Sequence, residues 1–262
     1  MRQPWKTLGA SLFVLIMTAR PLEAGNQELK TLQESTDAVK GLCDIPLNGI
    51  PRALVNDAAG VAIIPHLVKT ALIVDRQFGH GVLLAHEPSG AWSSPVFVRL
   101  SGGGVGGQAG IQATELVLVF KTRKSFERAL AGKLTLGGDM SVAAGPIGRD
   151  SKIATDKGMQ SEIYSYSRSR GLFVGVSLEG AKLHVDERAN ELFYGLPGGR
   201  AMDVLAWHGP IIPPVEALKA QLMRLSPPPA VMLVPGSPPP AIITTPPPLP
   251  PAPVPVPPNQ GR

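Results

Sequence analysis

From Val61 onward the sequence consists of short apolar runs separated by turn signals, and this alternation limits the possible folds more than any other feature. Turn signals such as residues 87–90 and the pair Glu179-Gly180 stand between the runs. A spacing of roughly 8 to 12 residues predicts an antiparallel meander that closes into a barrel or a sandwich. The runs are residues 61–64, 70–76, 81–85, 91–100, 115–121, 172–178 and 182–185.

A helical period precedes, interrupts and follows these runs. Leu29, Leu32, Val39 and Leu42 recur at helical spacing with charged residues between them, which predicts a helix over residues 26–42. The remaining predicted helices cover residues 51–59, 124–131 and 215–225. The predicted fold class is therefore α+β: a mainly antiparallel β barrel or sandwich with N-terminal helices and one inserted helix.

Residues 1–24 have the pattern of a signal peptide. Arg2 and Lys6 precede an apolar run over residues 8–19, and small residues follow at Ala24. The run is shorter than the roughly 20 residues of a membrane-spanning helix, so cleavage is favoured over an uncleaved anchor. We therefore expect an exported protein of the periplasm or cell envelope, or a secreted one.

Residues 226–262 form a proline-rich tail. Sixteen of the 28 prolines lie between Pro227 and Pro258, and Arg262 is the tail's one charged residue. Such a composition predicts an extended, disordered segment that serves as a spacer or as a docking peptide for a protein partner. Residues 25–225 remain as the folded domain.

Charge and cysteine content exclude several classes of protein. The chain has a formal net charge of +5, of which the signal contributes +2 and Arg262 +1, leaving +2 for the domain. This small charge does not indicate a nucleic-acid partner. Cys43 is the chain's single cysteine, so an intrachain disulfide and a cysteine-based metal site are excluded.

The run of residues 101–110 contains Gly102, Gly104 and Gly107 in the spacing G-x-G-x-x-G. A dinucleotide-binding loop needs a helix immediately after it, whereas an apolar, strand-like segment follows here. A second small-residue stretch covers residues 136–150. We interpret the glycines as sites of close backbone approach, either where strands cross or where a ligand lies.

The motifs that would indicate catalysis are absent from the sequence. Its five histidines form no H-E-x-x-H motif, and neither S-x-x-K nor G-x-S-x-G occurs. The phosphate-binding P-loop motif is also missing, because Gly132-Lys133 is followed by Leu134. We therefore expect a protein that is not an enzyme and uses no cofactor or metal.

Several ordered blocks resemble a known family. They are residues 92–95, 107–110, 114–120, 136–149, 165–173 and 175–178, and together they resemble the SYLF domain over about residues 41–195. The resemblance implies non-catalytic phospholipid binding, with phosphoinositides as ligands in eukaryotic members and actin binding in yeast members. An exported copy would meet no cytoplasmic actin, so we expect an anionic phospholipid or membrane surface as its partner.

Basic residues at three places are candidates for lipid binding. The alternation in 168–170 points two guanidiniums to one face of an extended segment, a geometry suited to phosphate oxygens. The candidates are Lys121, Arg123, Lys124, Arg149, Lys152, Arg168 and Arg170. The competing interpretation is that these side chains are solvated or paired with acids such as Asp150 and Glu162.

Two alternatives stay open at the level of the whole chain. The helix over 26–42 either lies in a lipid headgroup layer or docks on its own β domain, and its mixed charges favour docking. The competing function is that of an envelope structural or protein-interaction module that recruits partners through the tail.

Overall fold

The structure is a computed structural model and describes residues 21–43, 49–71, 74–105, 110–145, 161–170 and 178–226. Residues 1–20 of the predicted signal peptide, nearly all of the predicted tail, and Arg149 and Lys152 lie outside these residues, whereas residues 21–24, the end of the predicted signal peptide, belong to the first helix. Among the described residues, no helix is both long enough and apolar enough to cross a membrane.

The centre of the domain is a curled, mainly antiparallel sheet, as predicted. Its strand order is β5-β8-β3-β2-β1-β4-β7-β6, and every pairing is antiparallel except that of β6 with β7. The strands are β1 (Gly60–Ala71), β2 (Val74–Ala85), β3 (Val96–Val105), β4 (Gly110–Phe120), β5 (Leu134–Thr135), β6 (Val142–Ala144), β7 (Ile163–Arg170) and β8 (Lys182–Val185).

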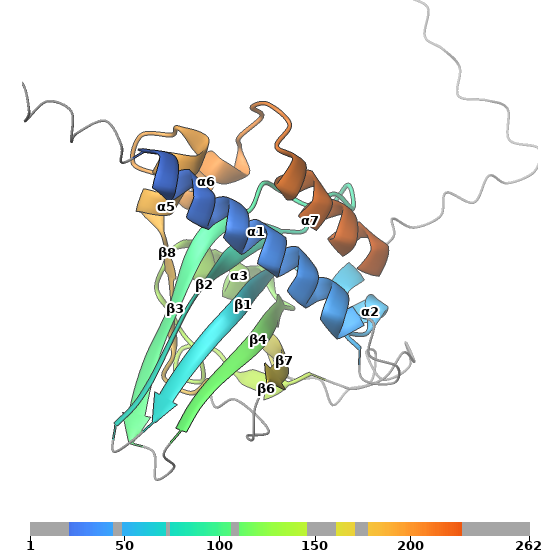
Figure 1. Ribbon diagram of the computed structural model, residues 1–262. Helices are drawn as coiled ribbons and strands as arrows, with labels where there is room; N and C mark the ends of the chain where they lie inside the picture. Colours follow the sequence, from blue (N-terminus) through green and yellow to red (C-terminus); the bar gives the residue numbers. More distant parts are fainter. Residues whose placement is uncertain are drawn as a thin grey trace, which may run out of the picture. The chain divides into compact units, whose positions relative to one another are not determined.

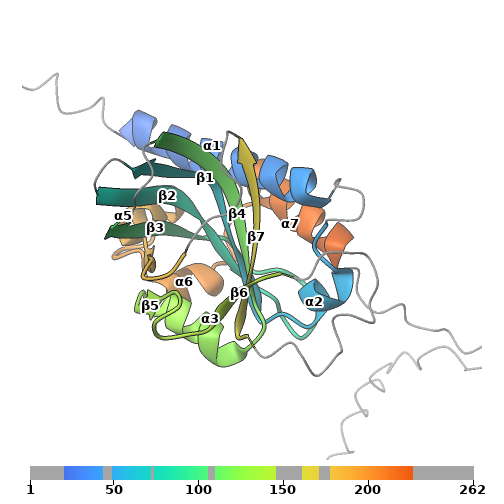
Figure 2. The same ribbon diagram turned by 90° about the horizontal axis from the view of Figure 1, so that it is seen from below.

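Helices cover both faces of one half of the sheet. Helix α1 lies across β1 and β2 on one face, and α7 packs beside it (Figure 1). Helix α3 lies on the opposite face, as seen from below in Figure 2. Its Phe126 packs edge-on against Phe120 of β4. The helices are α1 (Pro21–Cys43), α2 (Arg52–Asn56), α3 (Arg123–Leu130), α5 (Glu187–Tyr194), α6 (Ala201–Leu205) and α7 (Pro213–Leu225).

This double covering explains the continuous apolar runs of the sequence. Val61, Ile63, Val117 and Val119 face α1, while their neighbours along each strand face α3, and all are buried. A strand buried on both faces has no reason to alternate with polar residues. Beyond α1 the strands extend into a half that is exposed on the α1 face (Figure 1).

A β-bulge in β1 joins the two halves of the sheet. The pairings of β1 with β2 and with β4 both shift by one residue, between Ile63 and Val68 and between Ile64 and Leu67. Pro65 lies at this shift, where its missing N–H costs no ladder bond. The extra residue exchanges the faces of β1, which places Val68 on the α1 face.

The glycine run lies where strands pack closely. Gly102 belongs to β3, and a Cβ on it would come within 3.1 Å of Gln77 side-chain atoms and of the Cα of Ala181. The segment after the run is strand β4 and not a helix, as predicted. Similarly, a Cβ on Gly145 would overlap the ring of Tyr166.

Some predicted boundaries are wrong. Residues 70–76 were expected as one strand but contain the end of β1 and the start of β2, and the strand expected over 91–100 begins at Val96. Strand β7 and helices α5 and α6 were not predicted. The strand expected over 172–178 lies outside the described residues, apart from Leu178.

Candidate functional site

The first group of predicted basic residues lies where β4 leads into α3. Lys121 follows the last residue of β4, while Arg123 and Lys124 occupy the exposed first turn of α3. Thr122 caps this helix by accepting a hydrogen bond from the Ser125 amide at 3.2 Å. Arg123 pairs with Glu127 at 3.1 Å, on the solvent side of the helix.

The second group lies on β7 and is held differently. The Arg168 guanidinium donates two hydrogen bonds to Glu115 on β4, from Nε to Oε2 at 2.7 Å and from Nη2 to Oε1 at 2.9 Å. These bonds raise the pKa of Arg168. A Cβ on Gly41 would overlap the same guanidinium, so α1 packs directly on this pair.

The structure does not bring these two groups together. Phe120 pairs with Ile163 at one end of the β4–β7 ladder, while Ala113 pairs with Arg170 at the other. Seven residues of strand separate the two ends by roughly 23 Å. The side chain of Arg170 lies outside the description, as do Arg149 and Lys152. Lipid binding at these positions stays a prediction.

An exposed apolar pair lies on the α1 face of the sheet, in the half that α1 leaves uncovered. Val68 on β1 and Phe78 on β2 are directly paired and are 40% and 48% exposed. Because alternate residues of a strand share a face, Arg76 and His80 lie on the same side. We call Val68, Arg76 and Phe78 the platform.

A groove runs from the platform along α1. A cavity of about 400 Å³ lies between α1 and the platform, and Val68, Phe78 and Thr31 are among its lining residues. His66 and Glu34 pair across it, with Nε2 and Oε1 3.2 Å apart. Thr31 and His80 also line a second cavity of about 200 Å³, so the two cavities adjoin.

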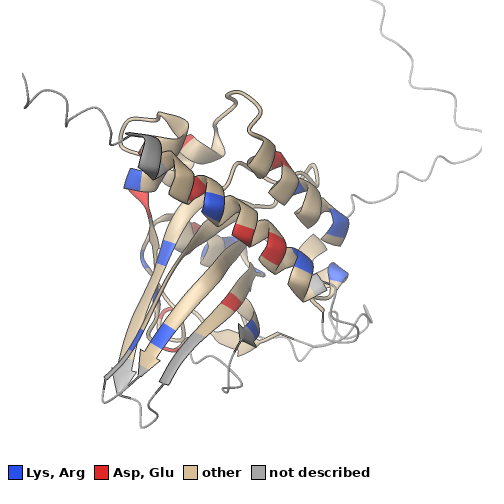
Figure 3. Cartoon of the chain, viewed as in Figure 1, with Lys and Arg blue, Asp and Glu red and all other residues tan. Residues whose placement is uncertain are grey.

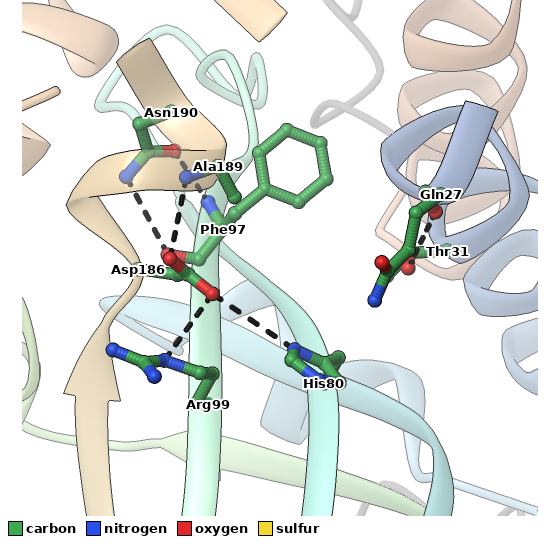
Figure 4. Close-up of polar contacts among 8 residues, drawn as sticks. All are labelled: Gln27, Thr31, His80, Phe97, Arg99, Asp186, Ala189 and Asn190. Atoms are coloured by element: carbon green, nitrogen blue, oxygen red, sulfur yellow. Dashed lines mark hydrogen bonds and ion pairs between the residues drawn. The ribbon is translucent and has the colours of Figure 1, made fainter. Parts of the chain in front are cut away.

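Asp186 lines this second cavity, and its side chain contacts three other described residues (Figure 4). It caps α5 by accepting from the Ala189 amide at 3.2 Å, and its Oδ2 lies 3.2 Å from Arg99 Nε and 3.9 Å from His80 Nδ1. Burial lowers the pKa of His80, and the nearby Arg99 acts in the same direction, whereas Asp186 opposes the shift. Asp186 therefore has its acceptors engaged by protein groups.

Glu28 on α1 lines the same cavity, and one oxygen of its carboxylate has no partner among the described residues. The residue is 8% exposed, and its Oε2 has no hydrogen-bond partner among the described residues. Burial raises the pKa of Glu28, a hydrogen bond from its own backbone N–H opposes this shift, and the nearby Asp186 adds to it. Acidic and basic residues are interspersed along α1 (Figure 3). The pattern of charges in the sequence therefore did not distinguish the buried Glu28 from the solvated charged residues.

The described residues thus form a curled sheet with an exposed apolar pair and a groove under the N-terminal helix. They contain no group of three or more histidine, cysteine, aspartate or glutamate residues placed to hold a metal ion. The sequence analysis missed both the platform and Glu28. Phe78, which stands among the polar residues Arg76, Gln77 and His80, was the available signal for the platform.

Comparison with known proteins finds a family model that matches part of the chain. Residues 101–225 match the model described as Ysc84, a Las17-binding protein actin regulator, in agreement with the resemblance of the sequence blocks to the SYLF domain. This family comprises non-catalytic binding domains.

Curated relatives are also similar to part of this chain. An SH3 domain-containing YSC84-like protein 1 from Xenopus laevis is 36% identical over 169 residues, which cover 64% of this chain and 50% of the relative. The LAS seventeen-binding protein 3 of Saccharomyces cerevisiae is 38% identical over 151 residues, which cover 56% and 32%. The matched region thus spans half or less of each relative.

Proposed function

We propose that this chain is a non-catalytic binder of anionic phospholipid at a membrane surface. The observation that carries the proposal is the platform, where two large apolar side chains are exposed side by side next to Arg76. Apolar side chains that enter the headgroup region and cations that meet lipid phosphates form the usual combination for reversible surface binding. The match to the Ysc84 family model supports a binding role of this kind.

The expected strength of membrane binding depends on how much each basic and apolar side chain contributes. Each basic residue near an anionic bilayer contributes about 1 kcal/mol, so Arg76 alone is too weak. Burial of the platform's apolar surface adds to it. The remaining predicted basic residues, Lys121, Arg123, Lys124, Arg149, Lys152 and Arg170, would add further contacts if the lipid surface reaches them. Arg168 is the weakest candidate because its guanidinium already holds Glu115.

The cellular context of the proposal is export, by way of the predicted signal peptide. The yeast relative's name refers to LAS seventeen binding, and the family description to Las17 binding and actin regulation. An exported chain does not meet cytoplasmic actin, which favours lipid over actin as its partner. The competing function is recruitment of protein partners through the proline-rich tail.

Vesicle flotation tests the proposal directly. The chain without residues 1–24 is floated with phosphatidylcholine vesicles and with vesicles that also contain phosphatidylglycerol, at low and high salt. We expect flotation with the anionic vesicles only, and less of it at high salt. The double variant Val68→Ser/Phe78→Ser should lose most of this flotation.

The matched control is Ile211→Ser, which removes an apolar side chain that is 83% exposed elsewhere on the domain. It should float like the unmodified chain. Equal flotation of the platform variant and the control would overturn the assignment to the platform. A complete absence of flotation would overturn lipid binding itself and leave the tail as the route to function.

A further inference from the structure

The cavity under the first turns of α1 has the composition of a binding site. Its volume is about 200 Å³, well above the 10–15 Å³ or so that one water molecule needs. Its walls come from four elements that are distant in sequence, α1, β2, β3 and α5. Phe97, Val98, Ala189 and Leu192 supply an apolar side, and Glu28 supplies a buried carboxylate.

Among the described polar groups around the cavity, one buried hydrogen-bond acceptor has no donor. Asp186 is engaged by Arg99 and by the Ala189 amide. Thr31 donates its hydroxyl proton to the Gln27 carbonyl at 2.9 Å. Glu28 Oε2 has no donor among the described residues, although a buried carboxylate oxygen without one is costly. A ligand that brings N–H donors and a positive charge would supply what Glu28 lacks.

The surroundings restrict which cation fits. Calcium takes six to eight oxygen ligands, and the described residues hold no cluster of three metal-binding side chains. A quaternary ammonium has no N–H to donate and is usually held by several aromatic rings, whereas Phe97 is the one aromatic residue other than His80 among the lining residues. A primary ammonium group matches a single open carboxylate.

A second charge lies at the edge of the cavity. Arg188 belongs to the lining and is exposed, and it forms no ion pair within the part of the chain that the structure describes. An exposed arginine next to a cavity is suited to a phosphate group. The buried Glu28 carboxylate thus suits the positive end of a short zwitterion, and the exposed Arg188 guanidinium suits its negative end.

We propose that this cavity binds an aminoalkyl phosphate of the phosphoethanolamine type, with its ammonium group on Glu28 and its phosphate at Arg188. The ligand's source is either a lipid headgroup or a free metabolite of the same chemistry. The proposal goes beyond surface binding through the platform, since neither Glu28 nor Arg188 belongs to it.

Calorimetric titration of the exported chain with O-phosphoethanolamine tests this site. We expect binding by the unmodified chain and a loss of affinity of about tenfold or more for Glu28→Gln, because one charge-assisted bond is removed. Arg188→Gln should weaken O-phosphoethanolamine but leave ethanolamine unchanged. The control Asp37→Asn removes an exposed carboxylate from the same helix and should bind normally.

Several results would overturn the proposal: no binding of O-phosphoethanolamine, equal affinity in Glu28→Gln, or equally strong binding of phosphocholine. Circular dichroism of each variant shows whether a loss reflects unfolding. Flotation with phosphatidylcholine vesicles, with and without phosphatidylethanolamine, then distinguishes the sources. Because this test uses a soluble ligand and leaves the platform intact, its failure is separate from failure of anionic lipid binding.

Discussion

At the scale of single residues, two carboxylates show how differently this fold treats buried charge. Glu115 is 6% exposed and accepts two hydrogen bonds from Arg168. Glu28 is similarly buried, yet one of its oxygens has no partner among the described residues. A group that a fold leaves unsatisfied at a cost in stability is more readily explained by binding than by folding.

The pH dependence of stability tests the state of Glu28. Its pKa is raised by burial, so the folded protein holds this proton more tightly than the unfolded chain does. The neutral form therefore favours folding below the ordinary pKa of about 4.3, and this advantage is lost as the pH rises through the raised pKa.

We predict that Glu28→Gln stabilises the ligand-free domain at pH 7 by about 1 kcal/mol and has almost no effect at pH 4. Thermal unfolding of both chains across this range measures the difference, which for a domain of this size is about 2–4 °C in Tm. Measuring both chains at each pH cancels the contributions of the titratable groups that they share. A destabilised variant at pH 7 would show that the carboxylate is satisfied in solution.

At the scale of elements, α1 belongs to the core of the domain. Leu32 and Val39 are fully buried, and Leu42 nearly so, between α1 and the sheet. The expectation that this helix docks on its own β domain is thus confirmed. The exposed positions of α1 carry both signs of charge (Figure 3), which is unlike the basic polar face of a typical interfacial helix.

Leu32→Ala should therefore behave as a core substitution. We predict that it lowers the free energy of unfolding by about 2–5 kcal/mol, because it removes buried methyl groups and leaves a cavity. Gln33→Ala, at the next and exposed position, should change it by less than about 0.5 kcal/mol. Urea denaturation followed by circular dichroism gives both values, and a Leu32 effect as small as that of Gln33 would mean that α1 is only loosely attached.

Elements with strong local signals were predictable, and those set by tertiary contacts were not. Helix α1 and the central strands follow from hydrophobic periodicity and continuous apolar runs. Strand β7 was not predicted because its serines and arginines interrupt the apolar pattern. Arg168 was predicted as a lipid-binding residue because its partner Glu115 lies 53 residues away in the sequence. The bulge that places Val68 on the platform depends on the register of three strands, which the local sequence does not encode.

At the scale of the whole domain, the end of α7 is tied to the loop between β2 and β3. Trp92 is buried, stacks on His86 with ring centroids 4.5 Å apart, and donates its indole N–H to Ser226 Oγ at 3.1 Å. Ser226 also donates to the Leu222 carbonyl at 3.2 Å. The first residue of the predicted tail is thus packed into the domain.

This arrangement predicts that the last 36 residues can be removed without loss of the fold. A chain ending at Ser226 should keep its Tm and its flotation with anionic vesicles, because every described core contact remains. Ser226→Ala in that chain should cost about 1–2 kcal/mol, since it leaves the buried Trp92 N–H without an acceptor.

Two measurements, thermal unfolding and flotation, separate the possible roles of the tail. If flotation persists in the shortened chain while capture of a proline-recognising partner is lost, the folded domain binds lipid and the tail recruits protein. If flotation disappears although the Tm is unchanged, the residues after Ser226 carry the membrane contact. That outcome would reject the platform as the lipid-binding surface, because Val68, Arg76 and Phe78 are all retained in the shortened chain.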